Sequence, residues 1–275
     1  LHKEYRRQRQ MCIRDRNMIV TYITEAGGVG KTTLCFNLGW HLANEGKKVL
    51  VVDADPQNTN VTRMAGFTKE QKENMAGLVD ILNRDVDIKE TIIKLSPRLS
   101  IIPANERTAS VEEIDRVISE KKMGPKALWD ALKKVSADYD YVFIDTSPAP
   151  SILHWLALVA SDGAVLPVLP DAKSVDATKT ILETCETVKQ SQNQDLNVLA
   201  VVFNKFVKNS NLARMAKKEI TAICRSKKIP VAQTEIRNNS AIGEVYISHE
   251  GITTYDPSSS GAKNIKALSQ ELFGV

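Results

Sequence analysis

One short glycine-rich segment constrains this chain more than any other part of its sequence. Residues 25–33 read EAGGVGKTT, directly after an apolar run and directly before an amphipathic stretch. Gly27, Gly28 and Gly30 allow positive φ and close backbone approach, so successive N–H groups can turn toward one anion. A helix that begins immediately afterwards adds the partial positive charge of its N-terminus. The segment therefore predicts a loop that binds phosphate.

The side chains after the glycines extend this prediction to a nucleoside triphosphate with Mg²⁺. Lys31 can reach the β- and γ-phosphates, and the hydroxyl of Thr32 can ligate the metal. The usual spacing of such loops has a further glycine where this chain has Glu25, so the motif departs from that spacing at one position. The expected nucleotide-binding residues of the loop are Gly27, Gly28, Val29, Gly30, Lys31, Thr32 and Thr33.

Two other apolar runs end in carboxylates. Residues 49–52 precede Asp53 and Asp55, and residues 141–144 precede Asp145. In an open parallel sheet, ligands lie outside the carboxyl ends of the strands, so these acids are expected beside the phosphate loop. We predict that Asp145 holds Mg²⁺, that Asp55 orients or deprotonates the attacking water, and that Asp53 supports the metal or that water. A single acid at a strand end is often a helix cap. Three such acids together with the phosphate loop are strong evidence for a nucleotide and metal site.

The pattern from residue 18 onward alternates short apolar runs with longer amphipathic ones. It predicts an α/β fold with a mostly parallel central sheet flanked by helices on both faces. Together with the phosphate loop, this predicts a fold of the P-loop NTPase type. Residues 18–275 are expected to form a single domain. The expected strands are 18–24, 48–53, 99–102, 141–145, 164–168, 197–203 and 230–234. The expected helices lie near 31–45, 75–83, 125–136, 151–160, 174–190, 209–227 and 260–273.

Composition excludes several classes of protein. The 275 residues are 43% hydrophobic and 25% charged, as in soluble globular chains. No apolar run is long enough for a transmembrane helix, and no apolar run follows the basic N-terminus as in a secretory signal. The cysteines form no CxxC pair and have no zinc-site spacing, so reduced thiols in a cytoplasmic protein are expected; they are Cys12, Cys35, Cys185 and Cys224.

The net charge of +4 resides in the first 17 residues, which hold six basic and two acidic side chains. Residues 1–17 are interpreted as a disordered or non-native basic arm, with a DNA-touching arm as the alternative.

A second basic cluster spans residues 205–237, where only Glu219 and Glu235 oppose nine cations. Phosphate contacts require charge rather than base readout, so the cluster suits non-specific DNA, although a solvated helix face has the same composition. The cations are Lys205, Lys208, Arg214, Lys217, Lys218, Arg225, Lys227, Lys228 and Arg237.

GGVGKTT, DADPQ and the strand ending in Asp145 resemble the deviant Walker A ATPases, a group that includes ParA and MinD proteins. The similarity to ParA covers essentially residues 18–275, and YDPSSSGA (255–262) favours ParA over MinD. The other segments that carry it are DADPQNTNVT (53–62), IIPAN (101–105), DYDYVFIDTSP (138–148) and ASDGAVLPV (160–168).

The resemblance implies an ATP-binding DNA-partition ATPase for plasmid or chromosome segregation, using ATP, ADP and Mg²⁺. It implies a nucleotide-gated homodimer on non-specific DNA, a ParB-type centromere-binding partner and a cytoplasmic, nucleoid-associated location. It also implies that Asp55 is the hydrolytic acid, and that Lys31 and Asp53 act with it. Asn204 is the expected adenine contact, or else a strand-end cap.

Ala26 is the departure from this pattern that matters most. The family carries there a second lysine that reaches the phosphates of the dimer partner, and a cation placed on developing phosphate charge can change a rate by about 10³–10⁵ when it acts as an arginine finger does. Three explanations of Ala26 are open. It is an engineered change, or a natural divergence in which another cation substitutes, or it belongs to a degenerate ATP-binding switch or scaffold. A MinD-like membrane-site ATPase is a further alternative. Residues 263–275 instead predict a packed closing helix and no stable membrane binding.

Overall fold

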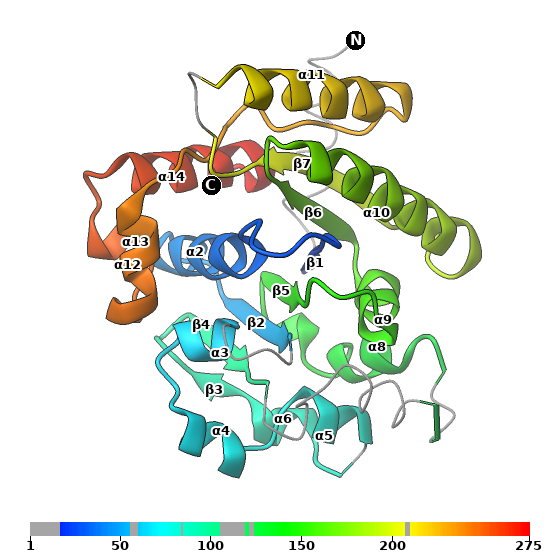
Figure 1. The fold of residues 1–275 in the computed structure, drawn as a ribbon. Coiled ribbons are helices and arrows are strands. Elements are labelled where there is room, and N and C mark those ends of the chain that lie inside the picture. Colours follow the sequence, from blue (N-terminus) through cyan, green and yellow to red (C-terminus); the bar gives the residue numbers. More distant parts are fainter. Residues whose placement is uncertain (1–16, 56–59, 84, 105–118, 121–123, 207–209) are drawn as a thin grey trace.

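A computed structural model describes residues 17–55, 60–83, 85–104, 119–120, 124–206 and 210–275. At the centre of these residues lies a seven-stranded sheet with the order β3-β4-β2-β5-β1-β6-β7. Neighbouring strands are parallel except for the β3–β4 pair at one edge. Helices cover both faces of the sheet (Figure 1). The predicted α/β fold of the P-loop NTPase type is confirmed.

The sheet strands differ in burial. All five strands between the edge strands β3 and β7 are buried along their whole length, as expected for strands covered on two faces. The strands are β1 (Met18–Tyr22), β2 (Val49–Ala54), β3 (Ile93–Lys94), β4 (Leu99–Ile102), β5 (Tyr141–Thr146), β6 (Gly163–Val168) and β7 (Asn197–Phe203).

Helices connect the strands and close the chain. The longer ones are α2 (Lys31–Asn44), α9 (Ile152–Ala160), α10 (Ala172–Ser191), α11 (Asn211–Ser226), α12 (Ser240–Ser248) and α14 (Ser260–Phe273). The shorter ones are α3 (Val61–Met64), α4 (Lys69–Asn74), α5 (Leu78–Asn83), α6 (Ile88–Thr91), α8 (Ala127–Leu132), the 3₁₀ turn η2 (Ser136–Asp138) and α13 (Ile252–Tyr255).

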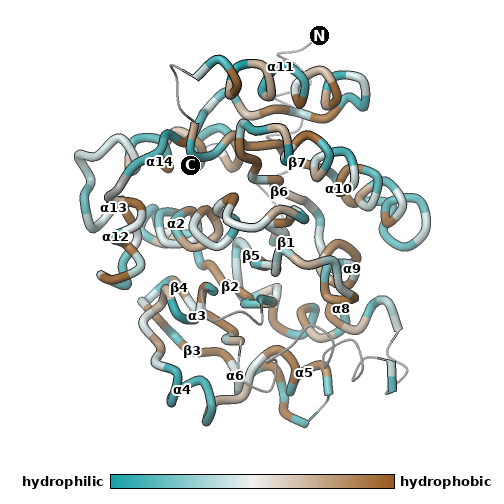
Figure 2. The backbone as a smooth tube through the Cα atoms, in the orientation of Figure 1, coloured by the Kyte–Doolittle hydropathy of each residue, from teal (hydrophilic) through white to brown (hydrophobic). Residues whose placement is uncertain are grey.

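Alternating residues of the strands build separate cores on the two faces of the sheet. In β1, Val20 and Tyr22 pack into the cluster that α2 and α14 cover. Ile19 packs into the opposite cluster, with α5, α8 and α9. A third cluster joins β6 and β7 to α10 and α11. Figure 2 shows the corresponding hydrophobic colouring along β6, β7 and α9. The two-residue period of a strand produces this division.

The predicted strand at 230–234 does not form. Its chain runs beside β7 through an isolated bridge between Val201 and Val231. Pro230 has no N–H to donate, and the amides of Gln233 and Thr234 donate instead to the Glu271 carboxylate of α14, at 2.7 and 2.9 Å. Those two amides are therefore not available for hydrogen bonds to a neighbouring strand.

The sequence patterns also missed elements. The antiparallel strand β3 has only two residues, and α3, α4, α6, α12 and α13 were not expected. Most of them are too short to show helical periodicity in a sequence. The prediction for the segment 1–17 lies outside the described residues except for Asn17, and Cys12 lies outside them as well.

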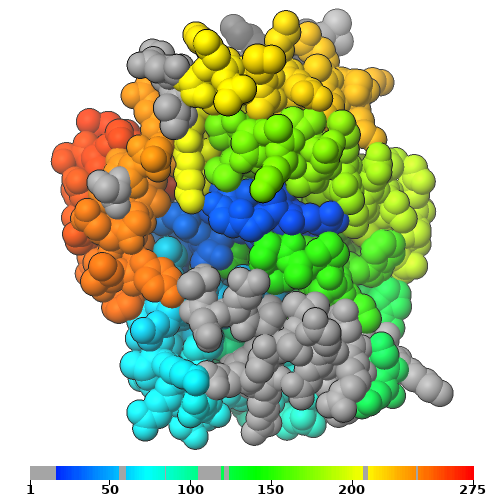
Figure 3. Space-filling model, viewed as in Figure 1, coloured from blue at the N-terminus to red at the C-terminus, as the bar shows by residue number. Residues whose placement is uncertain are grey.

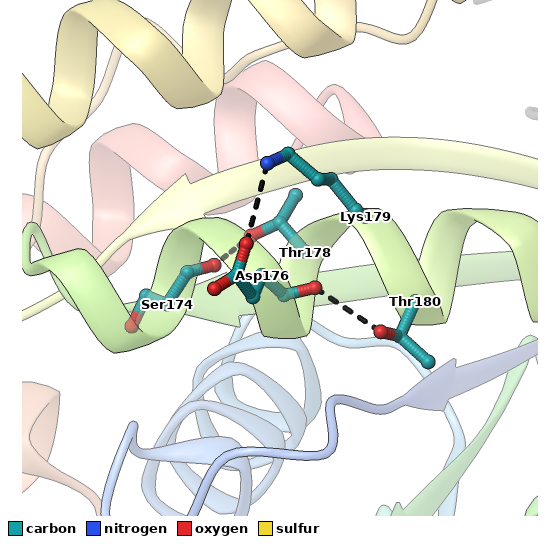
Figure 4. Close-up of polar contacts among 5 residues, drawn as sticks. All are labelled: Ser174, Asp176, Thr178, Lys179 and Thr180. Atoms are coloured by element: carbon teal, nitrogen blue, oxygen red, sulfur yellow. Dashed lines mark hydrogen bonds and ion pairs between the residues drawn. The ribbon is translucent and has the colours of Figure 1, made fainter.

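Helix α10 begins two residues before its expected start because Asp171 caps it: the Asp171 carboxylate accepts from the Ser174 amide at 2.8 Å. Figure 4 shows how this helix satisfies its threonines, since Thr178 and Thr180 donate to carbonyl oxygens one turn earlier. Lys179 pairs with Asp176 beside them. Local hydrogen bonds of this kind hold hydroxyl side chains within a helix.

The closing helix α14 packs against α2 with Ile265, Leu268 and Leu272 buried. The prediction of a packed helix at the end of the sequence is thereby confirmed. Within the described ranges, none of the helices combines the length and the apolar character needed to cross a membrane.

Candidate nucleotide-binding site

The predicted phosphate loop connects β1 to α2 at the carboxyl edge of the sheet. Gly28 and Gly30 have left-handed backbones, with φ of 69° and 93°. The φ of Gly27 is not positive, so a left-handed backbone does not require glycine there. Gly30 caps α2 without any side-chain hydrogen bond, and the first turn of the helix carries no acid. The amides at this helix end therefore remain available to an anion. Figure 3 shows the blue loop at the surface between green and yellow segments.

Asn204, at the end of β7, holds the loop from the side. Its side-chain Nδ2 donates to the carbonyl oxygen of Val29 at 2.7 Å. A Cβ added to Gly30 would lie 2.1 Å from the same nitrogen, so only glycine fits there. Asn204 is buried, and these contacts give it a role in shaping the loop. Its contact with adenine stays a prediction.

Lys31 lies folded over the loop, with 5% of its surface exposed. Its Nζ donates to the carbonyl oxygens of Thr24 and Ala26, at 3.3 and 3.2 Å. Burial lowers the pKa of this ammonium group, while the carboxylates of Asp145 and Asp55 oppose that shift. A lysine whose ammonium group donates to neutral carbonyl oxygens can exchange them for charged phosphate oxygens, which accept more strongly.

Asp53 and Asp145 lie opposite one another in register on β2 and β5, and both are completely buried. Three donors satisfy Asp53: the amide and the hydroxyl of Thr62, and the amide of Asp55. Burial nevertheless raises the pKa of Asp53 to about 7, with Asp55 adding to the shift and the Thr62 hydrogen bonds opposing it. The contacts suit Asp53 to hold the chain that follows β2 in place.

Asp145 has a different environment. Among the described residues, no hydrogen bond of good geometry reaches either of its carboxylate oxygens, and the side chain of Thr32 is its hydrogen-bonding neighbour. Burial first, and then the negative charges of Asp53 and Asp55, raise its pKa well above the usual value, while a hydrogen bond from the Thr32 side chain and the positive charge of Lys31 oppose this rise. A buried carboxylate with so few hydrogen bonds is costly. A cation would relieve that cost.

These residues fit Mg²⁺. Within the described part of the chain no group of three or more His, Cys, Asp or Glu side chains could hold a metal alone. Mg²⁺ does not need such a cage, because it commonly keeps several waters and binds one or two protein groups together with substrate phosphates. Asp145 and the hydroxyl of Thr32, in the first turn of α2, are the groups that would hold it.

Asp55 lies just beyond β2 and is buried with 5% of its surface exposed. Its carbonyl oxygen accepts from Asn60 Nδ2 at 2.7 Å, and Asn60 in turn caps α3 through the Arg63 amide. The Asp55 charge acts on Lys31 and on Asp145. The structure thus brings Lys31, Asp53, Asp55 and Asp145 together, as the sequence predicted.

Sequence reasoning missed Asn60, Thr62 and the contact of His154. Thr62 joins Asp53 to the end of β4, because its hydroxyl also accepts from the Ala104 amide at 2.9 Å. The ring nitrogen Nε2 of His154 lies 2.6 Å from the carbonyl oxygen of Ser147, just after β5. A polar residue shortly after an acidic strand end was the available signal for Asn60 and Thr62. No such local signal existed for His154.

The basic cluster does not form one uniform surface. Lys205 Nζ donates to the carbonyl oxygen of Gly28 in the phosphate loop at 3.0 Å. Lys217 pairs with Glu235 and lies over the rings of Phe203 and Phe206. Lys208 lies outside the described residues. The remaining cations are exposed on or shortly after α11, and they are Arg214, Lys218, Arg225, Lys227, Lys228 and Arg237.

The fold and this group of residues define a P-loop NTPase. The family model described as an AAA domain matches residues 17–198. The chain is 35% identical over 257 residues to the sporulation initiation inhibitor protein Soj of Bacillus subtilis, covering 92% of this chain and 97% of Soj. The chain belongs to the ParA/MinD-type P-loop ATPases.

Two further proteins are similar to this chain. The chromosome partitioning protein ParA of Myxococcus xanthus is 29% identical over 259 residues, which cover 93% of this chain and 87% of that protein. Among solved structures, an ATP complex of a variant of Cyanothece McdA superposes with a TM-score of 0.81 at 21% identity, covering 94% of this chain and 96% of McdA. At that identity, the likeness to McdA concerns the fold.

Proposed function

We propose that this chain is an ATP- and Mg²⁺-binding partition ATPase, which forms a nucleotide-gated dimer and binds DNA without sequence preference. One observation carries the proposal: Lys31 and the buried carboxylate of Asp145, which has Thr32 beside it, lie at the same sheet edge as the uncapped start of α2. The ATP complex of McdA and the partition role named for the ParA relative support the choice of nucleotide and process.

Each residue of the site then has a defined task. The amides of Gly28 to Thr33 and the Lys31 ammonium bind the β- and γ-phosphates. Thr32 and Asp145 hold the metal, and Mg²⁺, when bound, neutralises charge on the β- and γ-phosphate oxygens. Asp55 orients or deprotonates the attacking water, while Asp53 and Thr62 fix the chain that carries Asp55.

The primary test is calorimetric titration of the full chain with ATP, with and without Mg²⁺. We expect binding that requires Mg²⁺ and that Lys31→Ala abolishes. Phosphate release is then measured with DNA and the cognate ParB-type partner present, against Asp55→Ala as the inactive control. A folded protein with no affinity for the Mg²⁺ complex of ATP would refute the proposal.

The exposed cations of α11 and the segment after it form the proposed DNA surface. These six are exposed. Lys205 contacts Gly28 and Lys217 contacts Glu235, and Arg214 donates to Asn211 within its own helix. If all six contact phosphates, the logarithm of the DNA association constant falls with the logarithm of salt concentration at a slope of about −5. Charge-removing substitutions at Arg214 and Lys218 together should reduce this slope to about −4. An unchanged slope would place the DNA elsewhere.

A second function, a switch or scaffold that holds ATP with little turnover, is favoured by one observation. The side chain at position 26 carries no charge. The carbonyl oxygen of Ala26 accepts a hydrogen bond from Lys31. Ala26→Lys decides between the two functions. A large gain in hydrolysis and dimerisation would identify position 26 as the lesion and support the scaffold for the present chain. Normal hydrolysis in the unmodified chain would support the partition ATPase.

A MinD-like membrane role receives less support. The apolar face of α14, which would have to lie on a bilayer, is buried against α2. Vesicles of anionic lipid, incubated with the protein and ATP, should therefore sediment without it.

A further inference from the structure

Lys205 lies where a second positive charge would act on the nucleotide. Its Nζ is 3.0 Å from the carbonyl oxygen of Gly28, within the segment that would surround the phosphates. In Figure 3 yellow atoms, from the segment that follows β7, reach the blue loop. The sequence alone placed this residue in a DNA-binding cluster, 177 positions away from Gly28.

The backbone around Lys205 is built to direct it there. Lys205 adopts a left-handed conformation with φ of 50°, which non-glycine residues seldom occupy. Its amide donates to Asn204 Oδ1 at 2.8 Å, while Asn204 Nδ2 holds Val29. The end of β7 and the loop are thus joined by two adjacent side chains, one buried and neutral, the other exposed and charged.

The loop itself carries little positive charge to balance the negative charge of a bound triphosphate. Glu25 and Ala26 supply no positive charge, so Lys31 is the ammonium group within the loop itself. Three carboxylates, Asp53, Asp55 and Asp145, lie close behind it. A triphosphate brings further negative charge, most of all at its terminal phosphate.

We propose that Lys205 is the second cation of the triphosphate site, and that it leaves the Gly28 carbonyl to contact the terminal phosphate. The inference rests on the proposed function and names a residue which acts on the same nucleotide. An ammonium group stabilises a terminal phosphate more than the backbone carbonyl it leaves, because the new hydrogen bond joins two opposite charges. The triphosphate gains this contact, and the diphosphate lacks the group that would make it.

The test is calorimetry of the full chain with the Mg²⁺ complexes of ATP and ADP. Lys205→Gln should weaken ATP binding by about tenfold and ADP binding by less than about threefold, the range that one partly screened charge supplies. Lys205→Arg, which keeps the charge, should retain discrimination between ATP and ADP. Lys94→Gln is the matched control, since Lys94 is an exposed lysine in β3 at the opposite edge of the sheet.

The outcomes separate the two proposals. Equal losses for ATP and ADP in Lys205→Gln would show that Lys205 only braces the loop, and would overturn the inference. The inference would also be overturned if Lys205→Gln bound ATP as tightly as the unmodified chain does. It would be overturned as well if Lys205→Arg bound ATP as weakly as Lys205→Gln does. If the unmodified chain binds neither nucleotide, the proposed function itself fails. Thermal melting of each variant confirms that it is folded before titration.

Discussion

Asp53 and Asp145 face each other in register on adjacent parallel strands, yet Asp53 accepts three hydrogen bonds and Asp145 has far weaker hydrogen bonding. Thr62 and the Asp55 amide satisfy Asp53, whereas among the described residues Asp145 has Thr32 as its hydrogen-bonding neighbour and no bond of good geometry. Two identical side chains at equivalent positions therefore perform different tasks. We expect Asp53 to stabilise the protein and Asp145 to bind a cation.

Asp145→Asn should uncouple Mg²⁺ from nucleotide binding without damaging the fold. The substitution buries amide N–H donors but removes a negative charge beside Asp53 and Asp55, and the amide oxygen can still accept from Thr32, so the free energy of unfolding without ligand should not fall by more than about 1 kcal/mol. Melting temperature is measured with ATP, with and without Mg²⁺. We expect the Mg²⁺-dependent rise of the unmodified chain to be lost. A variant that keeps this rise would assign the metal to another residue.

Asp53→Ala should have the opposite profile. It leaves the Thr62 amide, the Thr62 hydroxyl and the Asp55 amide without their acceptor in a buried place. Unsatisfied buried donors cost about 1–3 kcal/mol each, partly relieved by relaxation. Urea denaturation should show a free energy of unfolding lower by at least about 2 kcal/mol. A smaller loss than that of Asp145→Asn would contradict the distinction drawn between the two acids.

Gly30→Ala should destroy the site through steric conflict. The new methyl group would lie 2.1 Å from Asn204 Nδ2, and the backbone φ is 93°. Gly46→Ala is a matched control, because Gly46 has a φ of 89° but nothing within 4 Å of its added Cβ. Both variants incur the left-handed backbone cost of about 1–2 kcal/mol. Only Gly30→Ala should also lose ATP binding in calorimetry, and comparable affinities would show that Asn204 can move aside.

The three described cysteines, Cys35, Cys185 and Cys224, should resist alkylation at neutral pH, because all are free and buried. Burial raises the pKa of Cys185 to about 12 and that of Cys224 to about 11. Since the thiolate reacts, folded protein should label far more slowly than urea-unfolded protein at pH 8. Iodoacetamide labelling followed by peptide mass spectrometry measures each site. Rapid labelling of any of them in the folded chain would indicate local opening.

The same shifts fix the sign of a stability change in alkali. A thiol whose folded pKa exceeds its unfolded value contributes full stability below the unfolded pKa, about 8.5. That contribution is lost as pH rises toward 11 and then 12, where Cys224 and Cys185 would ionise. The free energy of unfolding should therefore decline over this range, and less steeply when both cysteines are replaced by alanine.

The sequence by itself determined the phosphate loop, the acidic strand ends and six of the seven sheet strands that were expected. These features are local: glycine spacing, a lysine after it, and apolar runs that end in carboxylates are all readable within a few residues. The parallel arrangement followed from the alternation of strands and helices, and it placed Asp53 and Asp145 at one edge before their register was known.

Only the tertiary structure decided which partners these residues have. Asn204 and Lys205 reach the loop from more than 170 positions away, and Glu271 of α14 takes the amides that would have extended a strand at 230–234. Lys217 lies against aromatic rings and Glu235, apart from the other cations. Hydrogen bonds and ion pairs depend on distances between atoms that the fold brings together, and sequence spacing carries no record of those distances.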